Sequence, residues 1–187
     1  KEWEAIQNWK TAKEVEYKAW FDESLEKLEI RREKAVENAG IKEALVQKAE
    51  ELSQQPGYFW ARQFDNPANP SIHYQTTGQE IIQAFDGETP DAFVAGIGTG
   101  GTITGVGRAL KEKNAAVQII GVEPEEAPFI SKGQKGKHRI QGISAGFLPS
   151  IIDKEVIDDF ELITSELAIE TAKKLAATEG ILTGISS

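Results

Sequence analysis

Apolar and polar positions follow two different patterns along the chain, and the pattern changes near Gly40. In residues 1–40 apolar side chains recur at helical intervals, and opposite charges lie three or four positions apart. From Gly40 onward, short apolar runs of strand length alternate with amphipathic stretches of helix length. We therefore expect a helical segment over residues 1–40, followed by an α/β part over residues 41–187.

The second part is expected to form a parallel sheet covered by helices, because strands that alternate with helices at this spacing are joined by crossovers. Asn69 with Pro70 is expected to cap one helix, and Ser165 is expected to be the N-cap of the last one. The predicted class is α/β, with a three-layer, mainly parallel sheet flanked by helices and an added N-terminal helical segment. Helices are predicted at residues 41–53, 69–84, 102–113 and 165–179, and strands at residues 93–96, 117–122, 156–163 and 181–182.

Trp3, Trp9 and Trp20 fall on one apolar stripe of the N-terminal helical segment. Aromatic side chains at helical spacing usually fill cores, because each removes a large apolar area from water. We therefore expect this stripe to pack on the rest of the chain. A partner-binding face is the alternative.

Composition narrows the classes of partner and chemistry. The 187 residues are 40% hydrophobic and 27% charged with a net charge of −9, which favours a globular protein and argues against nucleic acid or an anionic membrane as a partner. Cysteine is absent, which excludes disulfides, a thiolate nucleophile and thiolate metal ligands. His73 and His138 lack metal-ligand spacing, so structural or solvent-exposed roles are expected for both. No apolar run is long enough to span a bilayer and no signal peptide is visible, so a cytoplasmic location is expected.

The most informative stretch is the glycine-rich turn at residues 96–102, which lies between a predicted strand and a predicted helix. Glycine lets the backbone come close to a ligand, and the first turn of a helix presents unpaired N–H groups at its positive end. Thr99 and Thr102 add two hydroxyl groups. Together these features predict a cradle for a phosphate group.

The turn matches neither of the two common nucleotide motifs completely. It lacks the Gly-Lys-Ser/Thr ending of a P-loop. Gly96, Gly98 and Gly101 do match the spacing of a dinucleotide-binding loop, and Glu123 lies near the position of its ribose-binding acid, roughly 20 residues on. The turn alone therefore leaves three alternatives: a dinucleotide, another phosphate-bearing ligand, and a packing turn that binds nothing.

Residues 98–102, Gly-Thr-Gly-Gly-Thr, and the segments around them resemble cysteine synthase (O-acetylserine sulfhydrylase), a fold-type II pyridoxal-phosphate enzyme. The resemblance extends over about residues 41–187, and the matching segments keep the family's order. They are Gln-Phe-Asp-Asn-Pro-Ala-Asn-Pro at 63–70, His73, Thr-Thr-Gly at 76–78, Gly-Val-Glu-Pro at 121–124, His-Arg-Ile-Gln-Gly-Ile-Ser-Ala-Gly-Phe at 138–147, Glu-Gly-Ile-Leu at 179–182 and Gly-Ile-Ser-Ser at 184–187.

The resemblance implies a site for pyridoxal phosphate. The residues that it implies for the cofactor phosphate are Gly98, Thr99, Gly100, Gly101 and Thr102. It further implies that Ser186 hydrogen-bonds the pyridine nitrogen, with Ser187 as the second choice, and that residues 142–145 line the cofactor's edge. The family reaction replaces the acetate of O-acetyl-L-serine with sulfide.

Two motifs of the family do not occur in this sequence. They are a Ser-Val-Lys-Asp-Arg-like segment, which carries the cofactor-binding lysine, and a Thr-Ser-Gly-Asn-Thr-Gly-like loop for the substrate carboxylate. Lys132, Lys135 and Lys137 lie in a polar loop and are expected to be solvated, so no catalytic residue and no metal site is assigned. We expect an excised or engineered fragment that is inactive alone, with a small-molecule cofactor or phosphate as its ligand. The alternatives are one half of a split enzyme, completed by another fragment, and a structural or protein-interaction module that pairs with a partner or a second copy of the chain.

Overall fold

The computed structural model describes Glu23 and residues 39–187, which divide into two compact units. One unit contains the residues up to 61 together with residues 170–183, and the other contains residues 62–169 together with residues 184–187. Apart from Glu23 and residues 39–40, the expected helical segment lies outside the described residues, and so does its tryptophan stripe. Their structure and role, like the boundary placed near Gly40, stay predictions.

The first unit contains helix α2 (Ala39–Ser53) and most of helix α7 (Ser165–Glu179). α2 ends shortly before Pro56 and Gly57, and Gly57 takes a left-handed conformation with φ 89°. Proline cannot continue a helix and glycine adopts positive φ without strain, so the sequence enforces this stop. The helices predicted at residues 41–53 and 165–179 are both confirmed.

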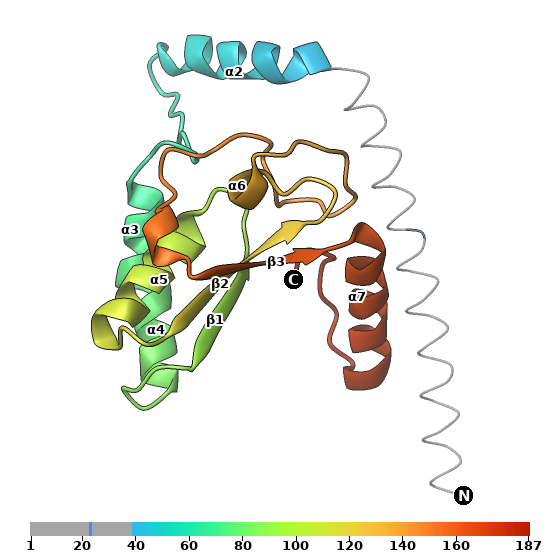
Figure 1. The fold of residues 1–187 in the computed structure, drawn as a ribbon. Coiled ribbons are helices and arrows are strands. Elements are labelled where there is room, and N and C mark those ends of the chain that lie inside the picture. The colour runs from blue at the N-terminus through green and yellow to red at the C-terminus, as the bar shows by residue number, and fades with distance from the viewer. Residues whose placement is uncertain (1–22, 24–38) are drawn as a thin grey trace, which may run out of the picture. The chain divides into compact units, whose positions relative to one another are not determined.

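The second unit is built on a parallel three-stranded sheet in the order β1-β2-β3 (Figure 1). The strands are β1 (Ala92–Gly96), β2 (Gln118–Pro124) and β3 (Asp159–Ile163). Ala92 pairs with Gln118, and Ile120 pairs with Asp159, so all three strands end at the same edge. The predicted α/β class, a mainly parallel sheet flanked by helices, is confirmed.

Helices α3 (Ala68–Gln75), α4 (Thr77–Ala84) and α5 (Gly101–Lys113) lie together beside this sheet (Figure 1). α5 contacts β1 and β2, and it also contacts α3 and α4. Its apolar side chains Ile103, Val106 and Leu110 recur at helical spacing and are at most 1% exposed. α5 is thus the buried helix that connects the sheet to the outer pair α3 and α4.

The single helix predicted at residues 69–84 is wrong, because the chain breaks at Thr76 into α3 and α4. Thr76 has φ −119° and ψ −75°, and its hydroxyl donates to the Ile72 carbonyl oxygen at 2.7 Å. A β-branched residue that bonds back to the preceding turn favours a helix end. The following Gly78 then lies buried, where a methyl group would come within 2.6 Å of the Ala109 Cβ.

The remaining elements are short helix α6 (Phe129–Lys132) and the 3-10 turn η1 (Lys154–Val156). The strand predicted at residues 181–182 is wrong, since these residues form no regular element and their side chains are about half exposed. The N-cap of α7 also differs from the prediction. Thr164 rather than Ser165 accepts from a first-turn amide, that of Leu167 at 3.2 Å.

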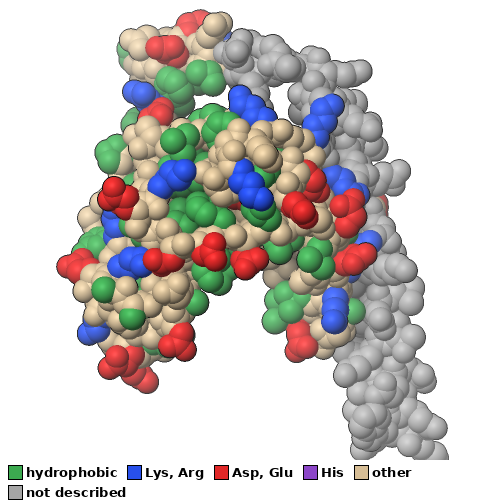
Figure 2. Space-filling model, viewed as in Figure 1, with side chains coloured by type: hydrophobic (Ala, Val, Ile, Leu, Met, Phe, Trp, Pro, Cys, Tyr) green, Lys and Arg blue, Asp and Glu red, His purple; other side chains and the backbone are tan. Residues whose placement is uncertain are grey.

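Acidic and basic side chains are interspersed over the face shown in Figure 2. Within the described part of the chain, no helix is both long and apolar enough to cross a membrane. The same residues contain no group of three or more His, Cys, Asp or Glu side chains that could hold a metal ion.

Candidate functional site

The candidate site is the turn at residues 97–100, between the carboxyl end of β1 and the amino end of α5. Ile97 fixes the start of the turn, because its side chain is 1% exposed and its N–H donates to the Val122 carbonyl oxygen at 3.1 Å. Gly100 then reverses the chain with φ 84°, a left-handed conformation in which a side chain is strained. Strand β1 and the buried helix α5 therefore hold the two ends of the turn.

Several backbone N–H groups of this turn find no acceptor within the described part of the chain. Among the described residues, the amides of Gly98, Thr99, Gly100 and Thr102 donate no hydrogen bond, and the first intrahelical bond is that from Thr104 to the Gly100 carbonyl at 3.1 Å. Unpaired amides at a helix start carry the positive end of the helix dipole and attract anions. The predicted site residues are thus brought together as a group of donors, whose size and charge suit a phosphate.

The hydroxyl groups of Thr99 and Thr102 both contact side chains of α3. Asn69 Nδ2 donates to Thr99 Oγ1 at 3.1 Å, and His73 Nε2 lies 3.2 Å from Thr102 Oγ1. The expectation that Asn69 caps a helix is wrong, because α3 already begins at Ala68 and its N-cap residue is Pro67, with no side-chain cap hydrogen bond. Asn69 and His73 therefore belong to the surroundings of the turn.

The glycines of the turn are required by close backbone approach. A methyl group on Gly98 would lie 2.7 Å from the Gly142 carbonyl oxygen, and one on Gly101 would lie 2.0 Å from Asn69 Oδ1. Ser144 N–H also donates to the Ile97 carbonyl oxygen at 2.9 Å, which ties the loop at residues 142–146 to the turn. Any larger side chain would push these segments apart. Glycine at positions 98 and 101 therefore lets the turn pack closely against Gly142 and Asn69.

Ser186 lies beside the same strand end. Its carbonyl oxygen is 3.4 Å from the position of a methyl group on Gly96, and its Oγ is 4.0 Å from that of a methyl group on Gly142. The final turn is closed by a 3.1 Å hydrogen bond from the Ser187 amide to the Gly184 carbonyl oxygen. The structure thus places the predicted serine next to the glycine turn and the loop at residues 142–146, and it leaves Ser186 exposed.

Glu123, the acid considered for a dinucleotide ribose, is fully buried at the end of β2. Its Oε1 accepts from the Ile130 amide at 2.7 Å, and its Oε2 accepts from the amide and hydroxyl of Ser131 at 2.8 and 2.6 Å. Both carboxylate oxygens are therefore engaged at the start of α6. This geometry argues against the dinucleotide alternative, because a buried and fully bonded acid cannot also bind a ribose.

Glu126 has a comparable anchoring role near the start of α7. Burial would raise the pKa of its carboxyl group, but hydrogen bonds from Ser165, with a smaller contribution from His138, outweigh this and hold the pKa below its usual range. One of these bonds joins the Ser165 amide to Glu126 Oε1 at 2.8 Å. The charged carboxylate therefore holds the loop after β2 against the start of α7.

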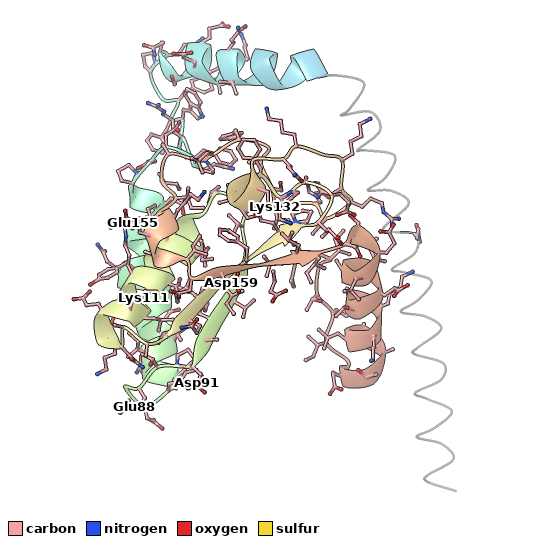
Figure 3. The ribbon with its side chains drawn as sticks, viewed as in Figure 1. Glu88, Asp91, Lys111, Lys132, Glu155 and Asp159 are labelled. Atoms are coloured by element: carbon pink, nitrogen blue, oxygen red, sulfur yellow. The ribbon has the colours of Figure 1, made fainter. Side chains whose placement is uncertain are left out.

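Of the three lysines expected in a polar loop, Lys135 and Lys137 lie there, whereas Lys132 is the last residue of α6. Lys132, Lys135 and Lys137 are exposed, and Lys132 projects from α6 (Figure 3). Lys135 Nζ lies 5.7 Å from the centre of the Phe129 ring, a weak surface contact. The structure thus gives none of the three a buried setting of the kind that tunes a catalytic lysine.

Comparison with known proteins gives consistent matches. The family model described as pyridoxal-phosphate dependent enzyme matches residues 29–187. A cysteine synthase from Staphylococcus aureus is 46% identical over 142 residues, which are 76% of this chain and 46% of that protein. The chain therefore spans about half the length of the curated relatives that it matches.

Solved structures agree with the sequence matches. An O-ureido-L-serine synthase is 45% identical with a TM-score of 0.70, covering 73% of this chain and 43% of that one. A cysteine synthase from Entamoeba histolytica is 41% identical with a TM-score of 0.71, covering 77% of this chain and 42% of that one. The resemblance found in the sequence is confirmed.

Proposed function

Because this chain belongs to the family of pyridoxal-phosphate-dependent enzymes, we propose that it is the phosphate-binding part of a cysteine synthase-like enzyme. The observation that supports this most is the group of unpaired amides at Gly98, Thr99, Gly100 and Thr102, at the start of α5. Such a group stabilises a phosphate dianion by several hydrogen bonds and by the helix dipole.

Each predicted site residue then has a distinct task. The amides and hydroxyls of the turn bind the phosphate, and glycine at positions 98 and 101 lets the turn pack closely against Gly142 and Asn69. The proposed role of Ser186, whose side chain is exposed beside the turn, is to hydrogen-bond the pyridine ring nitrogen. When bound, pyridoxal phosphate supplies the electron sink for exchanging the acetate of O-acetyl-L-serine for sulfide.

The family's lysine motif does not occur in these 187 residues, so we propose that this chain binds the cofactor without attaching it covalently. After incubation with pyridoxal phosphate, reduction with borohydride and mass spectrometry, no single lysine should carry the cofactor stoichiometrically. One uniquely modified lysine would contradict the proposal that the cofactor is bound without covalent attachment.

Phosphate recognition is tested with pyridoxine 5′-phosphate, which lacks the aldehyde and therefore reports non-covalent binding only. Calorimetry should show saturable binding, while pyridoxine without phosphate should bind at least about tenfold more weakly, a loss of roughly 1.4 kcal/mol. Amide NMR signals of residues 98–102 should shift with the phosphate form alone. Equal binding of both compounds, or no binding, would contradict the proposed site.

A second proposal concerns the whole enzyme, because the chain covers only 46% of its curated relative. We propose that cysteine formation requires a second polypeptide that carries the lysine segment and the substrate-carboxylate loop. Mixing this chain with the N-terminal portion of the Staphylococcus aureus relative should then restore cysteine formation from O-acetyl-L-serine and sulfide. The matched control is the same mixture with Thr102→Val in this chain, which keeps the shape of the side chain and removes its hydroxyl. An unimproved rate in the first mixture would exclude this proposal.

A further inference from the structure

We propose that helix α3 orders the protons of the phosphate cradle, with Asn69 and His73 as positioning residues. Each donates a hydrogen bond to the oxygen of one threonine, Thr99 or Thr102, so both hydroxyl protons are left to face an anion. The inference rests on the proposed phosphate site, and it extends that site from the turn itself to a second helix.

The orientation of the Asn69 amide follows from a backbone contact. Asn69 Nδ2 lies 2.8 Å from the Gln63 carbonyl oxygen, and a carbonyl oxygen can only accept. The NH₂ group of the amide must therefore point toward Gln63. Its second N–H then reaches Thr99 Oγ1 at 3.1 Å, so Thr99 is the acceptor in this contact.

Thr99 Oγ1 receives a second hydrogen bond, from the amide of Gly101 at 3.3 Å. A hydroxyl oxygen has two lone pairs, and here both accept from nitrogen donors. The remaining role of this hydroxyl is to donate its own proton. Among the described residues no acceptor takes that proton, which leaves it available to a ligand in the turn.

His73 joins two threonines on different helices. Its Nδ1 lies 3.0 Å from Thr77 Oγ1 on α4, and its Nε2 lies 3.2 Å from Thr102 Oγ1 on α5. If Nε2 carries a proton, it donates to Thr102 and frees the Thr102 hydroxyl to donate outward. If Nε2 lacks a proton, Thr102 must donate to the ring and is lost to the anion. A cradle for a phosphate, which in its dianionic form only accepts, requires the first arrangement.

Two glycines of α5 make this support possible. A methyl group on Gly105 would lie 2.2 Å from the Pro70 carbonyl oxygen and 2.7 Å from His73 Cβ, and Gly101 makes the equivalent close contact with Asn69. Gly101 and Gly105 are four residues apart, as are Asn69 and His73, so one face of each helix meets the other over a full turn. The two helices are therefore close enough for side chains of α3 to reach hydroxyls at the start of α5.

The first test needs no ligand. Long-range ¹H–¹⁵N NMR of the free chain in mildly alkaline buffer distinguishes which ring nitrogen of a histidine carries the proton. The sequence has two histidines, so His73→Gln assigns the His73 signals by their loss. We expect protonated Nε2 at His73, and a ring protonated only at Nδ1 would overturn the inference even if phosphate binds.

The second test uses a matched pair of substitutions. The amide of glutamine can reach the place of Nε2, whereas the shorter asparagine can reach only the place of Nδ1. His73→Gln should therefore keep the affinity for pyridoxine 5′-phosphate within about threefold, while His73→Asn should lose about tenfold, the usual effect of one hydrogen bond. Urea unfolding of both variants shows that each is folded.

Equal losses of affinity in the two variants would overturn the positioning role. If His73 were purely structural, glutamine would not restore the affinity better than asparagine. Failure of the unsubstituted chain to bind pyridoxine 5′-phosphate would refute the proposed function and the positioning role together. A bound phosphate with the wrong histidine tautomer would refute only the inference.

Discussion

The left-handed turn at Gly100 is the point at which one residue type decides the shape of the site. Gly100 has φ 84°, and a methyl group there would lie 2.9 Å from both Cβ and Cγ1 of Ile152. Gly87 has nearly the same φ, 86°, but open space around it. Alanine at either position meets the left-handed strain of about 1–2 kcal/mol. Only at position 100 does it also overpack the core, at about 1–3 kcal/mol more.

We therefore predict that Gly100→Ala lowers the free energy of unfolding more than Gly87→Ala does, by about 1–3 kcal/mol. The measurement is urea denaturation of both variants beside the unsubstituted chain. Gly100→Ala should also weaken binding of pyridoxine 5′-phosphate, and Gly87→Ala should leave it unchanged. Equal losses of stability would show that backbone conformation alone makes glycine necessary at position 100.

At the scale of single residues, the sequence predicted the glycine turn but not the two residues of α3 that contact its threonines, Asn69 and His73. The glycine and threonine residues at 98–102 could be found because strand, glycines and helix are consecutive. Asn69 and His73 lie about 30 positions upstream, and their contacts depend on how closely two helices approach. A signal was present in their four-residue spacing. The Asn69-Pro70 pair instead favoured a cap for Asn69, and the lack of metal-ligand spacing favoured a structural or solvent-exposed role for His73.

At the scale of helices and strands, the close contact between α3 and α5 is what supports the turn. Gly105→Ala should lower the free energy of unfolding by about 1–3 kcal/mol, because the added methyl group overpacks the contact. The higher helix propensity of alanine offsets roughly 1 kcal/mol of this loss. Because α3 has to move, the substitution should also weaken pyridoxine 5′-phosphate binding without touching the turn. Calorimetry and urea unfolding measure the two effects. Lys113→Ala, at the exposed end of the same helix, is the control and should change neither by much. Unchanged binding in Gly105→Ala would show that the turn needs no support from α3.

Element boundaries show where sequence patterns lose information. The alternation of strands and helices was enough to predict that β1, β2, β3 and α5 exist, since each carries an apolar face. The predicted start of the third strand at position 156 is wrong, because Lys154–Val156 form a 3-10 turn and β3 begins at Asp159. The break at Thr76 depends on one hydroxyl that bonds back to Ile72, a local contact that apolar periodicity does not report. Ile181 and Leu182 have the apolar character of a strand, but a strand forms only where a neighbour offers hydrogen bonds.

At the scale of the whole molecule, Asp158 connects three elements of the second unit. Its Oδ2 accepts from the Ile119 amide of β2 at 2.7 Å, and its Oδ1 accepts from Lys111 Nζ of α5 at 2.8 Å. Its own amide donates to the Ile119 carbonyl oxygen at 2.8 Å, just before β3 begins. The hydrogen bond from Lys111, followed by that from Ile119, lowers the pKa of the Asp158 carboxyl below its usual value.

This lowered pKa determines how stability should change with pH. Since the folded-state pKa lies below the unfolded one, the stabilisation is complete above the unfolded pKa of about 4 and is lost as pH falls through the folded pKa. Asp158→Asn should lower the free energy of unfolding by about 1 kcal/mol at neutral pH, because a charged acceptor becomes neutral in a partly exposed pair. Urea unfolding between neutral pH and the acid limit of folding should show the two curves converging below about pH 4.

The neighbouring Asp159 supplies the matched control, and it is shown with Lys111 in Figure 3. Among the described residues its carboxylate accepts only from the Phe160 amide, at 2.7 Å, so it joins no second element. Asp159→Asn should therefore change stability by less than about 0.5 kcal/mol at neutral pH, as expected for a surface substitution. A difference in free energy of unfolding between Asp158→Asn and the unsubstituted chain that persists unchanged at acid pH would mean that the shape of Asp158, rather than its charge, makes it important. If the difference in free energy of unfolding disappears at acid pH for Asp158→Asn alone, part of the acid sensitivity of this α/β unit arises where α5, β2 and β3 meet.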